Sequence, residues 1–191
     1  MKSLVDRMPL LSDDQMDAAQ RAAAGELIAG PRKGVKGPFI PLLRSPELMA
    51  RLQKVGEYLR FESALPPRIS EFATLIVARH WTQQFEWFTH VPLALKAGTP
   101  KTIIDELGEG ARPAGMWTEE ALVYDFACEL SLNRGVCDET YRMAVETFGE
   151  RGVIDLVGII GYFTLISMVL NVAHTPPEPS SAIAPLPPMP R

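Results

Sequence analysis

Glu86 and His90 lie in an aromatic-rich stretch, RHWTQQFEWFTHVPLALKAG, at residues 79–98. Their four-residue spacing places a carboxylate and an imidazole one turn apart on the same face of a helix. Such a pair can act on one proton or hold one ligand, as general acid–base catalysis requires. The sequence therefore makes Glu86 and His90 the first candidates for a catalytic pair.

These two residues belong to a longer polar stripe if the helix is continuous. At about 100° per residue, four polar side chains fall within a stripe about 60° wide. They are Arg79, Gln83, Glu86 and His90. A mostly apolar stripe lies roughly opposite and is expected to face the core. Its members are Thr74, Ala78, Trp81, Phe85 and Phe88.

Two interpretations of the polar stripe stay open at this point. It could be the solvated face of an amphipathic helix, with Arg79 and Glu86 paired across two turns. Alternatively, Trp87 and Val91 flank the stripe, so part of it borders buried surface, where carboxylates and imidazoles have shifted pKa values. His80 is a second candidate on the Trp87 side, although a lone histidine there more often makes a structural hydrogen bond.

A metal site is not expected on this helix. His80 and His90 lie ten residues apart, about 15 Å along the helix axis and about 80° around it, which is too far for one ion. The two cysteines, Cys128 and Cys137, are nine residues apart, which fits neither a zinc cluster nor a redox Cys-x-x-Cys motif. We predict two reduced structural thiols and no metal.

The elements that must position these residues are predicted to be helices, because strand alternation is unconvincing throughout. The expected helices cover residues 12–29, 45–61, 66–91, 101–108, 118–133, 138–148 and 153–174. Pro92 is expected to kink or end the third helix, because it removes the hydrogen bond to the Phe88 carbonyl. The Gly- and Pro-rich segment 30–44 is expected to be a loop, and loops of this length in small domains often have a function.

The chain of 191 residues can bury one core of ordinary size. We therefore expect a single helical domain over residues 1–174, with N-terminal helices and a loop at 12–62 and the remaining helices at 66–174. Residues 175–191 contain seven prolines in 17 positions. This composition predicts an extended or disordered tail that could lie along a neighbouring subunit.

Composition also limits which kinds of partner and which cellular compartment we expect. A net charge of −4 without a run of Lys or Arg makes nucleic acid an unexpected partner. The N-terminus lacks the apolar core of a signal peptide, so we expect a cytoplasmic protein. The apolar stretch 153–172 is long enough to span a bilayer but lacks basic anchors on both flanks. We favour a helix buried by its own domain or by another subunit over a membrane span.

Four segments, in this order and spacing, carry a family resemblance. They are Pro-Pro-Arg at 66–68, ARHWTQQFEWFTH at 78–90, AGTP at 97–100 and DLVGIIGYFTLISMVLN at 155–171. Over roughly residues 37–176 the chain resembles the carboxymuconolactone decarboxylase family, whose superfamily also contains alkyl hydroperoxidase D. The resemblance implies an all-α, alkyl hydroperoxidase D-like bundle of about six to seven helices. It also implies a homo-oligomer, a trimer or hexamer, with the site near a subunit boundary.

The resemblance further implies a carboxy-lyase of aromatic compound catabolism, acting without a cofactor on a small cyclic carboxylic acid, lactone-type or aromatic-derived. His90 would be the general acid, and Glu86 would orient its ring and raise its pKa. Arg79 would hold a substrate carboxylate. The other candidates for substrate contact are Trp81, Trp87, Gln83 and His80.

Two alternatives belong to other functional classes. In the peroxidase branch of the superfamily the equivalent helix carries a Cys-x-x-Cys, whereas this helix has no cysteine. An alkyl hydroperoxidase-type antioxidant protein would therefore need Cys128 and Cys137 to meet. A non-catalytic oligomeric member of the family would bind a ligand without changing it.

Overall fold

Eight helices and no strand form the part of the chain that the structure describes, residues 5–178 and 182–188 of a computed structural model. The helices are α1 (Ala18–Ala29), α2 (Phe39–Leu42), α3 (Pro46–Phe61), α4 (Pro67–His80), α5 (Gln84–Ala97), α6 (Lys101–Gly108), α7 (Thr118–Asn133) and α8 (Asp138–Ala173). The predicted all-α class is confirmed.

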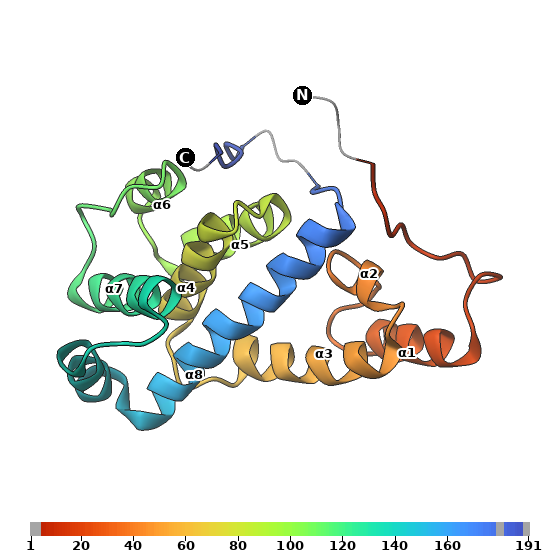
Figure 1. Cartoon of the computed structure of the whole chain (residues 1–191), viewed down its shortest axis with the longest axis horizontal. Helices are drawn as coiled ribbons and strands as arrows, with labels where there is room; N and C mark the ends of the chain where they lie inside the picture. Colours follow the sequence, from red (N-terminus) through yellow and green to blue (C-terminus); the bar gives the residue numbers. More distant parts are fainter. Residues whose placement is uncertain (1–4, 179–181, 189–191) are drawn as a thin grey trace.

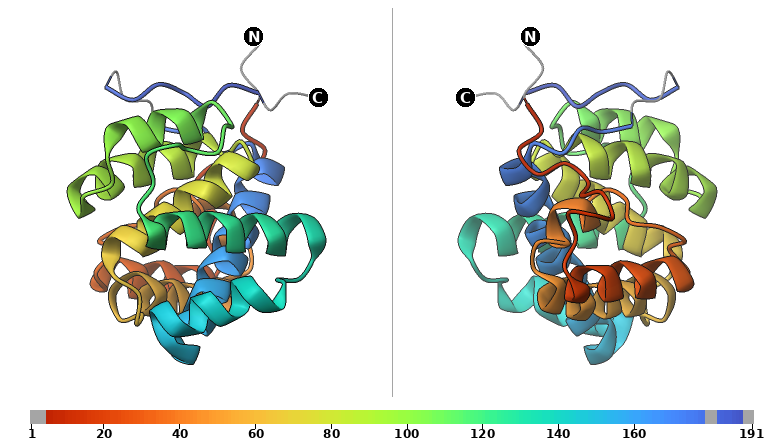
Figure 2. Two further views of the ribbon diagram at one scale, coloured as in Figure 1. Left: turned by 90° about the vertical axis from the view of Figure 1, so that its left-hand side faces the viewer. Right: turned by 90° about the vertical axis from the view of Figure 1, so that its right-hand side faces the viewer.

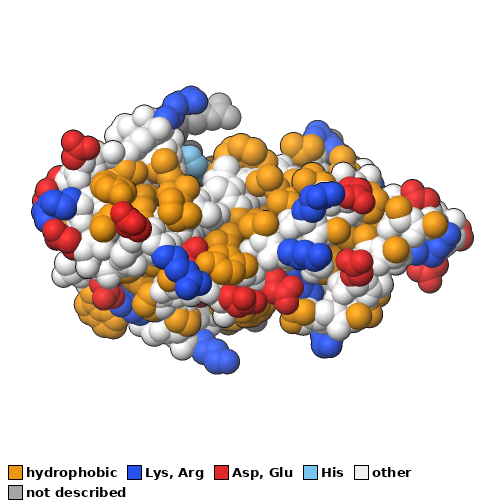
Figure 3. Space-filling view, turned by 90° about the horizontal axis from the view of Figure 1, so that it is seen from below, with side chains coloured by type: hydrophobic (Ala, Val, Ile, Leu, Met, Phe, Trp, Pro, Cys, Tyr) orange, Lys and Arg blue, Asp and Glu red, His pale blue; other side chains and the backbone are white. Residues whose placement is uncertain are grey.

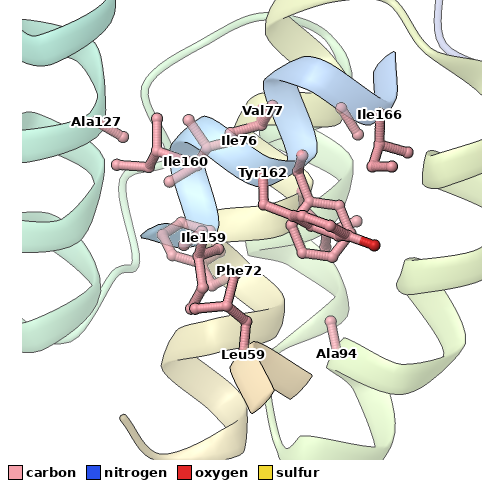
Figure 4. Close-up of a cluster of buried hydrophobic side chains, with 14 of the residues drawn as sticks. Leu59, Phe72, Ile76, Val77, Ala94, Ala127, Ile159, Ile160, Tyr162 and Ile166 are labelled. Carbon is pink, nitrogen blue, oxygen red and sulfur yellow. The ribbon is translucent and has the colours of Figure 1, made fainter. Parts of the chain in front are cut away.

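Helix α8 runs diagonally through the molecule and separates α1–α3 from α4–α7 (Figure 1). It packs against α2, α3, α4 and α7, and side chains from α3, α4, α5, α7 and α8 meet in one buried cluster (Figure 4). Ile159 and Ile166 of α8 and Phe72 of α4 are almost fully buried there. Each such side chain stabilises the fold by about 1.5–3 kcal/mol relative to an exposed position. The apolar character of α8 therefore reflects its place in the core.

Two predicted helices, 138–148 and 153–174, are joined end to end in α8. Gly149 interrupts the helical backbone with φ 69° and ψ 168°, where a residue without Cβ is favoured. By length and composition α8 could also cross a membrane, a criterion that the core helix of a soluble protein meets too. Of its most apolar 18-residue stretch, 56% is buried inside the protein.

The N-terminal part differs from the prediction at two places. The first helix begins at Ala18 rather than near Ser12, because Asp17 and Gln20 form a capping box in which each side chain accepts the other's backbone N–H. The segment 30–44 is not a loop throughout, because it contains the short helix α2.

The predicted single helix over 66–91 is wrong, because the structure has two helices there, α4 and α5. Helix α4 ends at His80, and Thr82 adopts a left-handed backbone conformation with φ 48°. Gln83 then caps α5 by accepting the Phe85 N–H at 2.7 Å. Pro92 lies inside α5, which continues to Ala97 and ends at the left-handed Gly98.

The C-terminal segment 182–188 begins with a turn, forms neither helix nor strand, and crosses the side of the molecule formed by α5 and α6 (Figure 2). On the face seen in Figure 3, apolar side chains form several patches between acidic and basic ones. In the part of α8 that follows Gly149, the exposed large apolar residues are Ile154, Val157, Met168 and Val172.

Thr82 generates the first prediction. A β-branched residue at positive φ costs about 1–2 kcal/mol, and glycine removes that cost while losing more entropy on folding. We expect Thr82→Gly to raise the free energy of unfolding by about 0.5–1 kcal/mol in urea titrations. The matched control is Thr102→Gly, on an exposed position of α6, which should lower the free energy of unfolding by about 0.5 kcal/mol. A destabilised Thr82→Gly protein would show that the turn carries no strain.

Candidate active site

His90 is held between two carboxylates that come from different helices. Its Nδ1 lies 2.6 Å from Oε2 of Glu71 on α4, and its Nε2 lies 3.3 Å from Oε2 of Glu86 on α5. The ring packs edge-to-face on Phe163 of α8, with the ring centroids 5.0 Å apart. His90 and Glu86 are only 3% and 4% exposed. The imidazole is therefore fixed at both nitrogens and on one side of its ring.

Opposing effects determine the charge of His90. Burial alone lowers the pKa of the imidazole, but the hydrogen bonds and negative charges of Glu71 and Glu86 outweigh burial and raise the pKa to about 9. At neutral pH the ring is thus an imidazolium that donates an N–H to Glu71. A charged, oriented imidazolium is suited to act as a proton donor.

A cavity of about 490 Å³ opens beside His90 and Glu86. Its walls come from the segment after α1 and from α2, α3, α5 and α8. The aromatic members are Phe39, Phe61, Phe85, Phe88, Tyr162 and Phe163. Glu71 does not line this cavity and lies behind the imidazole. Because Glu71 makes the shorter contact, it is the residue that orients the ring, and Glu86 stands with His90 on the cavity side.

The segment between α1 and α2 forms one wall because it approaches α5 closely. Gly37 has φ +54°, and a Cβ there would come within 2.3 Å of the Phe85 ring. Only glycine fits both this backbone conformation and this contact. Segment 30–44 therefore lies at the wall of the cavity beside His90 and Glu86.

Two arginines give the cavity a positive side. Arg32 and Arg60 line it, and Nη2 of Arg32 and Nε of Arg60 are buried without a hydrogen-bond partner among the described residues. Burial lowers the pKa of Arg32 from its usual value, with the nearby Tyr162 opposing this effect. Buried guanidinium nitrogens that lack partners are suited to bind an anion such as a carboxylate.

Tyr162 is pressed against α3 on the same side of the cavity. A Cβ at Gly56 would lie 2.2 Å from the Tyr162 hydroxyl and 2.9 Å from Nη2 of Arg32. Burial raises the pKa of Tyr162, although the charge of Arg32 works against it. Tyr162 therefore stays a neutral hydroxyl at physiological pH.

The solvated interpretation of the polar stripe is wrong, because Arg79, Gln83, Glu86 and His90 are 3–5% exposed. The stripe itself does not exist, since the turn at Thr82 separates Arg79 from the other three. Arg79 does not pair with Glu86 and instead donates to the backbone carbonyl of Pro187 at 2.7 Å.

The predicted substrate contacts do not gather around His90. Gln83 donates to Asn171 of α8, Trp87 donates to the Ala184 carbonyl, and His80 is exposed beside Trp81. Neither these residues nor Arg79 are among the described residues that line the cavity. Sequence reasoning correctly placed Glu86 and His90 together but missed others of the site, namely Glu71, Arg32, Arg60 and Tyr162. The only sequence signal for the arginines was the loop in which Arg32 lies.

The geometry at His90 does not suit a metal ion. The carboxylates of Glu71 and Glu86 engage opposite nitrogens of the ring, so one ion cannot contact both carboxylates and an imidazole nitrogen. Over residues 5–178 and 182–188, no group of three or more His, Cys, Asp or Glu side chains is arranged to hold one.

The surroundings of Cys128 do not activate its thiol. Cys128 and Cys137 are both free, and Cys137 is exposed. Burial raises the pKa of Cys128, and the hydrogen bond with Tyr124 only partly offsets this. An activated thiol needs the opposite shift, because the thiolate is the nucleophile.

None of the models of known protein families matches the chain, and no curated protein matches it either.

The raised pKa of His90 predicts a pH-dependent stability. The imidazole titrates near 6.5 when unfolded and at about 9 when folded. Its contribution is therefore complete below pH 6.5 and is lost as the pH rises through 9. We expect the free energy of unfolding to fall by on the order of 3 kcal/mol over this range, measured by urea titration at several pH values.

The control for this prediction is His90→Gln, which cannot titrate and should remove the step. The exposed His80→Gln should keep it. If wild type and His90→Gln show the same pH dependence, the imidazole is not stabilised in its charged form.

Proposed function

We propose that the protein is a cofactor-independent carboxy-lyase acting on a small cyclic carboxylic acid, lactone-type or aromatic-derived. The observation that carries this proposal is the imidazolium of His90, held by Glu71 and Glu86 at the wall of a cavity. Two arginine nitrogens on that cavity have no hydrogen-bond partner within residues 5–178 and 182–188. The cavity thus offers a proton donor and an anion-binding side within one largely apolar space.

The proposed reaction needs only these protein groups. The bond between the ring carbon and the carboxylate breaks, carbon dioxide leaves, and the electron pair moves into the conjugated carbonyl of the substrate. The imidazolium of His90 then gives its Nε2 proton to carbon, and solvent restores that proton. Glu71 keeps the ring oriented throughout, and Glu86 stabilises the charged form before transfer.

Arg32 and Arg60 supply electrostatic stabilisation in this proposal. Negative charge develops on the carbonyl oxygen as the carboxylate departs, and guanidinium groups that already line the cavity stabilise it without reorganisation. The sequence suggested Arg79 for anion binding, but Arg79 donates to the carbonyl of Pro187. We therefore assign anion binding to Arg32 and Arg60. The aromatic side chains of the cavity would bind the body of the substrate.

Family membership and assembly are part of the same proposal. The motif resemblance supports a place in the carboxymuconolactone decarboxylase family, with an alkyl hydroperoxidase D-like bundle that forms a homo-trimer or homo-hexamer in the cytoplasm. Four exposed apolar residues of α8, Ile154, Val157, Met168 and Val172, support association with further copies of the chain. Size-exclusion chromatography with light scattering tests the assembly directly.

Replacement of His90 tests the proposed chemistry. We expect His90→Gln to lower kcat by about 10²-fold or more, with the helical content unchanged in circular dichroism. The readout is carbon dioxide release from a panel of unsaturated lactone carboxylic acids, followed by mass spectrometry. His80→Gln is the matched control, because this histidine is exposed outside the cavity, and it should retain activity.

Two outcomes would contradict the lyase. Full activity in His90→Gln would remove this residue from the mechanism. Binding of an acid by the wild type without loss of carbon dioxide would instead identify a non-catalytic ligand-binding protein.

A further inference from the structure

Three side chains hold the segment 182–188 by hydrogen bonds to its backbone. Gln84 makes two hydrogen bonds with Leu186: Nε2 donates to the carbonyl at 2.8 Å, and Oε1 accepts the N–H at 3.0 Å. Nε1 of Trp87 donates to the Ala184 carbonyl at 3.1 Å, and Nη1 of Arg79 donates to the Pro187 carbonyl at 2.7 Å. Contacts of this type recognise an extended peptide as a neighbouring strand would.

The donors and acceptors of the groove match a proline-rich peptide. Pro185, Pro187 and Pro188 have no N–H, so residues 185–188 offer four carbonyls and a single backbone donor, that of Leu186. The groove provides three donors to the segment, from Arg79, Gln84 and Trp87. Oε1 of Gln84 accepts the N–H of Leu186, the single backbone donor within residues 185–188. A peptide without prolines would leave further N–H groups without partners.

Leu186 supplies the side-chain specificity. It is 4% exposed and belongs to the buried core, whereas Ala182, Ala184, Pro185 and Pro188 are exposed. One buried apolar anchor within a proline-stiffened backbone is typical of proline-rich peptide ligands, which lose little entropy on binding.

The segment 182–188 does not fill the groove. A cavity of about 390 Å³ remains between residues 182–187 and the helices α5 and α6. Arg79 is 3% exposed, yet its Nε and Nη2 have no hydrogen-bond partner among the described residues. A groove with spare volume and spare donors holds its occupant less firmly than a core does.

We propose that the groove formed by Arg79, Gln84, Trp87 and α6 is a binding site for an extended proline-rich peptide of the pattern Ala-Pro-Leu-Pro, and that the chain's own tail is its tethered, exchangeable ligand. This site is separate from the cavity at His90, and the inference does not rest on the proposed lyase activity.

Release of the tail in the full-length chain tests the site. Leu186→Asp should displace the segment, shifting the Trp87 indole N–H resonance and removing hydrogen-exchange protection from residues 182–188. Leu132→Asp makes the same change at an exposed position of α7 and should alter neither readout. Unchanged resonance and protection in Leu186→Asp would overturn the proposal.

A free peptide, Ala-Ile-Ala-Pro-Leu-Pro-Pro, then tests whether the groove binds in trans. The free peptide should bind the Leu186→Asp protein saturably, and the resonance of the Trp87 indole N–H should return towards its wild-type position. The peptide with Asp in place of Leu should bind at least tenfold more weakly. Absence of binding at millimolar peptide, with the fold intact by circular dichroism, would overturn the site.

A second variant covers the case in which Leu186→Asp does not fold. Gln84→Ala retains the buried Leu186 side chain and removes the side chain that pairs with both the N–H and the carbonyl of Leu186. Amide exchange at Leu186 should become at least tenfold faster in this variant, while the amides of α8 keep their protection. An unchanged exchange rate would show that the Gln84 contact does not hold the segment.

Discussion

The fold around the cavity depends on one constraint: a charged imidazole is buried only because two carboxylates share it. Removing an ionised side chain from water costs several kcal/mol, and attractive partners at close range must offset that cost. Glu71 and Glu86 do so from α4 and α5, and Phe163 of α8 closes one side of the ring. One buried ion cluster thus connects three elements. It depends on the chain reversal at Thr82, on the packing of α4 against α5 and on the position of α8.

The part of this cluster that depends on local spacing could be predicted from the sequence. Glu86 and His90 are four residues apart within one helix, so they meet in any fold that keeps the helix. Glu71 could not be predicted in the same way. In a continuous helix it would lie about 28 Å from His90, and only the reversal brings the two side chains to 2.6 Å. No glycine or proline marks that turn, whose backbone is set by Thr82 and the cap at Gln83.

The positive side of the cavity depends on contacts between segments distant in the chain. Arg32 lies after α1, Arg60 lies in α3 and Tyr162 lies in α8, and Gly56 allows two of them to approach. Helix periodicity indicates which face of an element is apolar, but it does not indicate which elements pack together. The tail shows the same limit. Its prolines predicted an extended or disordered tail that could lie along a neighbouring subunit, whereas residues 184–186 bind Gln84 and Trp87 of the same chain.

Glu71 occupies Nδ1 of His90, so only the Nε2 edge of the ring is left for chemistry beside the cavity. Arg32 and Arg60 meanwhile attract the negatively charged end of an asymmetric anion. A planar carbon held in this way would meet its proton from a single direction, so a product with a new stereocentre would form with one handedness. Solvent deuterium would then enter that position on one face only.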